Sequence, residues 1–255
     1  MILLSFFACS APVEAPEDFN ELLSYLFEHT MNEDRETLVA GANNLLAFSA
    51  ENEGVLREGY AVDNLSQMAL DSTGSTFPDA GDTYGVTLQY SVGYSVQNLA
   101  YANSAADGME VYPANYLSYE RENLSDIDCF LERTCDSFSY RSTIQSSLPL
   151  GAEMLSSYIS ELRWMNLDSG PALVHRSWMD GEAESSVDWA DMTANFYFGF
   201  IYSTETGSDT IAASWAAVQL GDVSVPEDIL KNQAIDGLRQ NGVDLENWFA
   251  ENAIE

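Results

Sequence analysis

The stretch from Phe138 to Phe249 constrains the fold most, because one consistent pattern runs through it. Apolar residues alternate with polar ones in successive runs, which is the period of a β-strand with one buried face. Turns rich in Gly, Asp, Ser and Pro separate the runs. The predicted strands are 138–150, 154–167, 172–179, 192–202 and 210–220. After Pro226 the apolar spacing becomes helical, so we expect antiparallel strands that close around one long C-terminal helix.

The preceding part of the chain adds a helical layer and one further strand. Residues 84–96 alternate without a break and predict a sixth strand, whereas the apolar stripes of 19–27, 37–50 and 63–70 predict helices. We therefore expect one α+β domain over 18–255. Its parts would be a helical part (18–83), a mainly β part (84–225) and the C-terminal helix (226–253). The predicted architecture is a curved antiparallel sheet of about six strands that grips this helix.

The charge of the chain restricts its partners. The 255 residues include 41 acidic and 9 basic side chains, and the formal net charge is −32 at pH 7. Such a chain repels phosphate backbones and anionic lipid headgroups. We therefore expect neither nucleic-acid binding nor electrostatic binding to membranes. The same charge favours a soluble monomer.

The N-terminus has a segment of its own. Met1 to Ala8 is apolar apart from Ser5 and ends at Ala8-Cys9-Ser10. This resembles the end of a bacterial lipoprotein signal peptide, and the resemblance implies a lipid on Cys9. The match departs from the pattern because Phe6 and Phe7 are unusual there and no basic residue precedes the apolar run.

Residues 1–9 would then be the signal segment and 10–17 a tether to the folded domain. The expected location is the bacterial cell envelope, either anchored to the outer membrane or in the periplasmic or extracellular space. Membrane contact would occur only through the lipid. The alternative is a frayed hydrophobic N-terminus without a lipid.

The other two cysteines, Cys129 and Cys135, are close enough in sequence to form a disulfide across a tight loop. An oxidising compartment would keep such a bond formed. Two unrelated free thiols are the alternative. The pair is a poor zinc site, because no further Cys or nearby His completes four ligands. We expect no metal and no cofactor.

The closing part of the chain is similar to a known family. Residues 196–202, the turn at 203–210, the Trp-containing run 213–221, Val225-Pro226 and the helix through Leu238 to Trp248 follow the closing pattern of START-like, helix-grip proteins. The resemblance covers about 138–250. It implies a central cavity that holds a lipid, a sterol or another apolar small molecule, without catalysis in most members.

Large rings on the predicted strands are the candidate lining of such a cavity. The strand 197–202 is apolar on both faces, so it should be covered on both sides. The candidate ligand-binding residues are Arg163, Trp164, Arg176, Trp178, Phe196, Phe198, Phe200 and Trp215. The alternative is that these rings simply pack a solid core. Arg163 and Arg176 would meet an anionic headgroup if they point inward, or pair with surface acids if they point outward.

No catalytic motif is present, and no catalytic residue is assigned. His175 could shuttle a proton, although a single histidine on a strand is more often a hydrogen-bonded sheet residue. The leading hypothesis is a non-enzymatic lipoprotein that binds a lipid or other apolar ligand. The alternatives are an envelope interaction protein with a solid core and an enzyme that uses His175.

Overall fold

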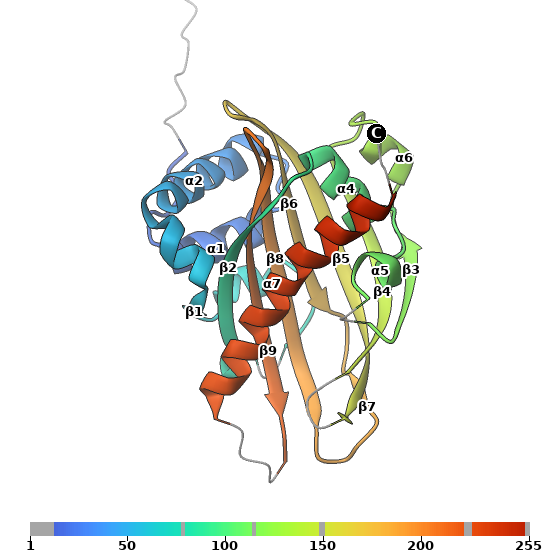
Figure 1. The fold of residues 1–255 in the computed structure, drawn as a ribbon. Helices are drawn as coiled ribbons and strands as arrows, with labels where there is room; N and C mark the ends of the chain where they lie inside the picture. Colours follow the sequence, from blue (N-terminus) through green and yellow to red (C-terminus); the bar gives the residue numbers. More distant parts are fainter. Residues whose placement is uncertain (1–12, 78–79, 114–115, 148–150, 222–225, 253–255) are drawn as a thin grey trace, which may run out of the picture.

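The computed structural model describes residues 13–77, 80–113, 116–147, 151–221 and 226–252. Cys9, with the rest of the predicted signal segment, and residues 10–12 of the tether lie outside these ranges. Figure 1 shows a large sheet with α7 crossing in front of it and the N-terminal helices α1 and α2 at one side.

Nine strands of the described chain form one antiparallel sheet. Their order is β1-β2-β9-β8-β6-β5-β4-β3, and β7 pairs with β5 beside this path. The strands are β1 (Tyr60–Val62), β2 (Tyr84–Val92), β3 (Ser118–Asn123), β4 (Ser137–Ser147), β5 (Glu153–Leu167), β6 (Gly170–Met179), β7 (Glu184–Ser185), β8 (Asp191–Thr204) and β9 (Gly207–Gln219). The predicted α+β class with a curved antiparallel sheet is confirmed. The six predicted strands correspond to β2, β4, β5, β6, β8 and β9.

The sequence pattern misses three strands and extends one too far. β1 and β7 are too short to show an apolar period. β3 reads Ser-Tyr-Glu-Arg-Glu-Asn, which is mostly polar and shows no such period either. β2 ends at Val92 rather than at residue 96. Ser95 accepts a hydrogen bond from the Asn98 backbone and begins α4 (Val96–Ser104) with a capping box. The local capping signal therefore overrides the alternation at this point.

The N-terminal helices cover one face of the sheet. They are α1 (Phe19–His29), α2 (Arg35–Glu58) and α3 (Gln67–Asp71), followed by the short 3-10 helix η1 (Ala80–Asp82). Leu22, Leu26 and Phe27 of α1 are fully buried in a cluster that also holds Phe198 of β8 and Trp215 of β9. This cluster is the largest apolar core of the described chain, and it joins the helical layer to the sheet.

The opposite face of the sheet is covered by α7 (Glu227–Asn252). The helix predicted from the sequence spans 226–253. Ile235 and Leu238 of α7 pack on Val86 and Leu88 of β2. At the far end of the helix, Phe249 stacks on Tyr94 with ring centroids 4.4 Å apart. A helix of 26 residues is about 39 Å long. It therefore reaches from the β2 side of the sheet to α4, and Figure 1 shows this diagonal course. None of the helices in the described ranges is long and apolar enough to cross a membrane.

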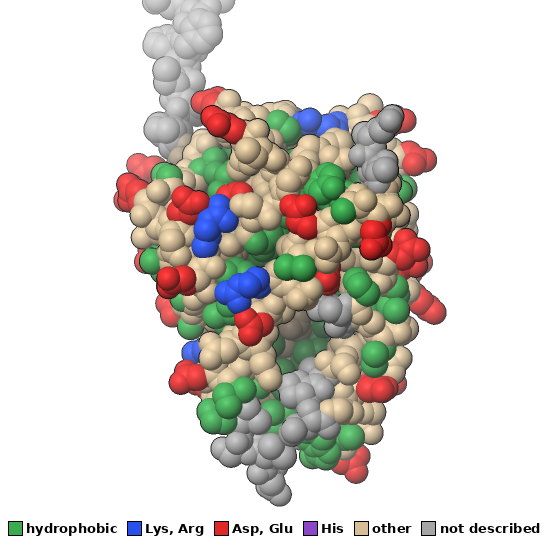
Figure 2. All heavy atoms as spheres, viewed as in Figure 1, with side chains coloured by type: hydrophobic (Ala, Val, Ile, Leu, Met, Phe, Trp, Pro, Cys, Tyr) green, Lys and Arg blue, Asp and Glu red, His purple; other side chains and the backbone are tan. Residues whose placement is uncertain are grey.

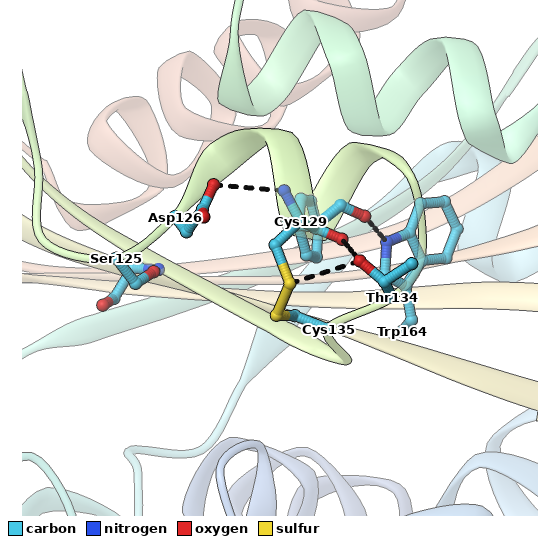
Figure 3. Close-up of a disulfide and its surroundings, with 8 residues drawn as sticks. Ser125, Asp126, Cys129, Thr134, Cys135 and Trp164 are labelled. Atoms are coloured by element: carbon cyan, nitrogen blue, oxygen red, sulfur yellow. Dashed lines mark hydrogen bonds between the residues drawn. A yellow bond between two sulfur atoms is a disulfide. The ribbon is translucent and has the colours of Figure 1, made fainter.

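The loop before β4 is closed by a disulfide. Cys129 and Cys135 are bonded, with Cα atoms 5.2 Å apart, so the predicted pairing is confirmed. Cys129 belongs to α6 (Ile127–Leu131), and Thr134 donates a hydrogen bond to its carbonyl at 3.1 Å. The Trp164 indole donates to the Phe130 carbonyl at 3.0 Å. Figure 3 shows the disulfide and the Trp164 side chain beside this loop.

Candidate functional site

A cavity of about 340 Å³ lies between the sheet and the middle of α7. The strands β3, β4, β5, β6, β8 and β9 contribute to its wall, as do α4 and the short helix α5 (Gly108–Val111). Figure 2 shows the surface hollowed on the face that α7 crosses. The described lining contains six tyrosines, five serines, three asparagines, one arginine and one histidine, and its remaining residues are small or apolar. The wall is therefore much more polar than the apolar lining expected from the sequence.

One row of side chains across five strands explains why there is space. The strand register places Tyr140, Ser160, Ser177, Tyr197 and Ser214 opposite one another, in that order, from β4 to β9. Directly opposed residues share a face of the sheet, so the whole row faces α7. Its three serines are short, so the floor of the cavity is low between and beside the tyrosine rings.

The helix above this row does not fill the gap either. Gly237 lines the cavity from α7, and a Cβ added to it would meet no heavy atom within 4 Å. Glycine costs a helix interior roughly 0.5–1 kcal/mol relative to alanine. A space above short side chains, opposite a glycine in a helix, is an arrangement that leaves room for a ligand.

Five of the lining tyrosines are held protonated at neutral pH by burial. Burial raises the pKa of Tyr112, Tyr116, Tyr119, Tyr158 and Tyr197, and the value for Tyr158 reaches about 12. Their hydroxyls can therefore donate hydrogen bonds, and their rings offer flat apolar surfaces. The cavity suits a ligand that has both apolar and hydrogen-bonding parts.

Arg121 is the only basic residue in the described lining. It comes from β3, where its Nε donates to the Tyr119 hydroxyl at 2.9 Å and its Nη1 donates to the Ser104 carbonyl. The guanidinium carbon lies 4.6 Å from the centroid of the Tyr140 ring and 5.2 Å from that of Tyr119. These cation–π contacts hold the charged group at the cavity wall.

His175 enters the cavity from β6. Its side chain is buried, and its Nε2 has no hydrogen-bond partner within the described chain. Burial, and secondarily the charge of Arg121, lowers the pKa of His175 to about 3. The imidazole is therefore neutral at physiological pH, and Nε2 remains available to a ligand.

Seven of the eight predicted ligand-binding residues lie on the other face of the sheet. Phe196, Phe198, Phe200, Trp178 and Trp215 belong to the core beneath the N-terminal helices, and Arg163 and Arg176 contact the end of α1. Trp164 is on the α7 side but packs against the disulfide loop. None of the eight lines the cavity. Aromatic content identifies the right strands, but neighbouring residues such as Phe196 and Tyr197 point to opposite faces.

Arg163 and Arg176 lie on the face of the sheet away from the cavity, beside the end of α1. Arg176 donates to the Phe27 carbonyl at 2.6 Å and pairs with Glu161 at 2.7 Å. Arg163 donates to the Thr30 carbonyl at 3.5 Å. Both cations lie at the C-terminal end of α1, where the helix dipole and unpaired carbonyls favour positive charge.

Two of the predicted residues line a second hollow. Arg163 and Trp164 border a space of about 270 Å³ beside the disulfide, together with Arg35 and Arg133. Arg133 donates to Asn166 at 2.8 Å and lies over the Trp164 ring, while Arg35 pairs with Asp136. Each arginine of this hollow thus has partners within the protein.

Arg121, the tyrosines and the serine row are not predicted from the sequence. The available signal is weak: serine and tyrosine share one face of β4 and β5, at Tyr140, Ser142, Tyr158 and Ser160. For His175, the sequence suggests only proton transfer or a hydrogen bond within the sheet, and not a contact with a bound ligand. Over the described ranges, no group of three His, Cys, Asp or Glu side chains is placed to hold a metal ion.

Comparisons with known proteins give matches in structure only. No protein-family model matches the chain, and no curated protein matches it in sequence. Among solved structures, it is similar to a STAR-related lipid transfer protein fragment from Xanthomonas axonopodis, with a TM-score of 0.43 and 9% identity over 65% of this chain and 84% of that one. A START superfamily protein from Mycobacterium smegmatis matches with a TM-score of 0.38 and 10% identity over 65% of this chain and 94% of that one. Human STARD10 matches with a TM-score of 0.40 and 9% identity over 66% of both chains.

The START-like, helix-grip arrangement expected from the sequence is confirmed by the molecule itself. Its determining features are the antiparallel order of the strands and the terminal helix packed on one face of the sheet.

Proposed function

We propose that this protein binds, without converting it, a small organic molecule in the cavity beneath α7. The observation that carries the proposal is an unfilled space of about 340 Å³ between the sheet and α7, with rings and hydrogen-bond donors in its wall. This volume is at the lower end of the range for small-molecule sites, which is about 300–1,000 Å³. The proposed ligand is a lipid-like or other partly apolar molecule, of about the size of a small drug.

Two alternatives receive less support. An interaction protein with a solid core would have no such space. An enzyme built on His175 would need a group to accept or orient its proton, but the described lining contains no Asp or Glu. Neutral His175 and protonated tyrosines are suited to hold a ligand by hydrogen bonds.

The experiment uses Gly237, because this position opens into the cavity. Gly237→Phe adds a ring at a lining position where a Cβ would meet no heavy atom within 4 Å. Gly54→Phe adds the same ring to α2, at a position outside the lining where a Cβ is equally free. The probe is N-phenyl-1-naphthylamine, an uncharged aromatic amine. Native mass spectrometry should show a one-to-one complex with the wild type and Gly54→Phe, and none with Gly237→Phe. Equal binding by Gly237→Phe would refute the proposal.

We further propose that the protein is a lipoprotein attached through Cys9 to the bacterial cell envelope. The support is the sequence around Cys9 together with the bonded Cys129–Cys135 pair, which suits an oxidising compartment. Intact-mass measurement of the protein expressed in membranes tests this. A mass that retains residues 1–8 and carries no lipid would refute it. In this location we propose a monomer whose only membrane contact is the lipid, and whose net charge of −32 disfavours nucleic acid.

A further inference from the structure

We infer that the ligand carries a negatively charged oxyanion, such as a carboxylate or sulfonate, which Arg121 binds at the cavity wall. The inference rests on the proposed function and adds the chemical class of the ligand to it. The anionic headgroup considered from the sequence would have met Arg163 and Arg176 instead, and both lie on the other face of the sheet.

The first support is the distribution of charge around the cavity. The chain has 41 acidic and 9 basic residues, yet the described lining contains one arginine and no acid. Repulsion from the net charge of −32 acts over the whole surface, but salt screens it beyond about 8–10 Å. At short range, an anion in the cavity therefore meets Arg121 and no described carboxylate.

The second support is that Arg121 lacks a charged partner. Its guanidinium has no carboxylate of the described residues within 4.0 Å, whereas Arg141 on the neighbouring strand pairs with Glu122 and Asp180. Two of its nitrogens bond to Tyr119 and Ser104, and Nη2 makes no hydrogen bond to the described residues. Arg121 also joins β3 to α4 through its hydrogen bond to Ser104, which is a structural role. That role does not explain why the described cavity wall contains no acidic residue.

The third support is a second polar group without a partner. His175 Nε2 is buried at the cavity wall and makes no hydrogen bond within the described chain. A buried polar atom of this kind costs free energy unless a ligand or water satisfies it. An oxyanion held by Arg121 would bring oxygen atoms into the same polar cavity. The tyrosine rings of the lining would then surround the rest of the ligand.

Two fluorescent probes that differ only by a sulfonate group test the inference. 1-Anilinonaphthalene-8-sulfonate and N-phenyl-1-naphthylamine share one ring system, and only the first carries a sulfonate. Fluorescence titrations would be run in about 0.5 M salt, which shortens the Debye length below about 8 Å. Subtracting the signal of Gly237→Phe removes binding outside the cavity. We expect the wild type to bind the sulfonate more tightly than the neutral amine.

Arg121→Gln should weaken sulfonate binding by about tenfold or more, because it removes a charge-assisted hydrogen bond. The same variant should weaken binding of the neutral amine by a clearly smaller factor, since that probe has no charged group for Arg121 to bind. Arg141→Gln is the matched control and should change neither affinity. Arg121→Lys keeps the charge without the planar fork and should retain part of the preference.

The outcomes separate this inference from the proposed function. A wild type that prefers the neutral amine, or an Arg121→Gln variant that affects both probes equally, would overturn the anion inference alone. If Gly237→Phe binds both probes as well as the wild type does, the cavity proposal itself fails. Should Arg121→Gln not fold, Arg121→Lys and the preference of the wild type still decide the question.

Discussion

At the scale of single residues, short side chains shape the interior of this protein. Ser160 and Ser177 lie side by side in the row between Tyr140 and Tyr197, and Gly237 faces the cavity from α7. Larger side chains at these positions would extend into the space above the sheet. The polar character of the cavity follows from the same residues, because serine and tyrosine hydroxyls remain at the wall.

The lowered pKa of His175 predicts that the protein loses stability in acid. Its pKa is about 3 in the folded protein, whereas an unperturbed histidine has a pKa of about 6.5. Between these values the unfolded chain binds the proton more tightly, so protonation favours unfolding as the pH falls. The free energy of unfolding of the wild type should therefore fall relative to that of His175→Gln, by about 1.4 kcal/mol per pH unit below pH 6.5.

Urea unfolding of both proteins between about pH 7 and pH 4 measures this difference. The comparison removes the contribution of the many carboxylates, which both proteins share. Parallel pH profiles for the two proteins would show that His175 is not held neutral by burial.

At the scale of elements, α1 is fixed to the sheet by cations at its C-terminal end. Arg176 of β6 donates to the Phe27 carbonyl and to Ser72, and it pairs with Glu161 of β5. The Arg176 side chain is only 4% exposed, so it is a buried cation with a nearly complete set of partners. This contact links the helical layer to the two central strands β5 and β6.

Removing Arg176 should therefore destabilise the protein strongly. Arg176→Met leaves Glu161 without its charged partner, and breaking a buried ion pair costs about 3–5 kcal/mol. Arg141→Gln, in an exposed pair, should cost no more than about 1 kcal/mol. Chemical denaturation gives both values. The double variant Arg176→Met with Glu161→Gln should recover part of the loss, and a loss for Arg176→Met as small as that for Arg141→Gln would contradict this account.

The elements themselves were largely predictable from the sequence. Five long strands and α7 follow from periods of two and 3.6 residues, because each element buries one face. The limits of β2 were not predictable from alternation, since Tyr94 continues the pattern while Ser95 caps a helix. β3 was not predictable because four of its six residues, including Arg121, are charged or amide-bearing and its burial pattern is mostly exposed.

At the scale of the whole molecule, the sheet separates two kinds of interior. The face toward α1 and α2 is a packed aromatic core, and the face toward α7 holds the polar cavity. Composition predicted a ring-rich interior but not which face it would occupy, because that depends on the register of neighbouring strands. The row from Tyr140 to Ser214 joins residues from five strands, and periodicity within single strands does not give their mutual alignment.

The most direct test of the central claim is a crystal structure of the protein soaked with N-phenyl-1-naphthylamine. The account predicts electron density for the dye between α7 and the serine row of β5 and β6, next to Gly237, with the sheet unchanged. Side chains of the protein filling that space, or dye bound only elsewhere, would contradict it.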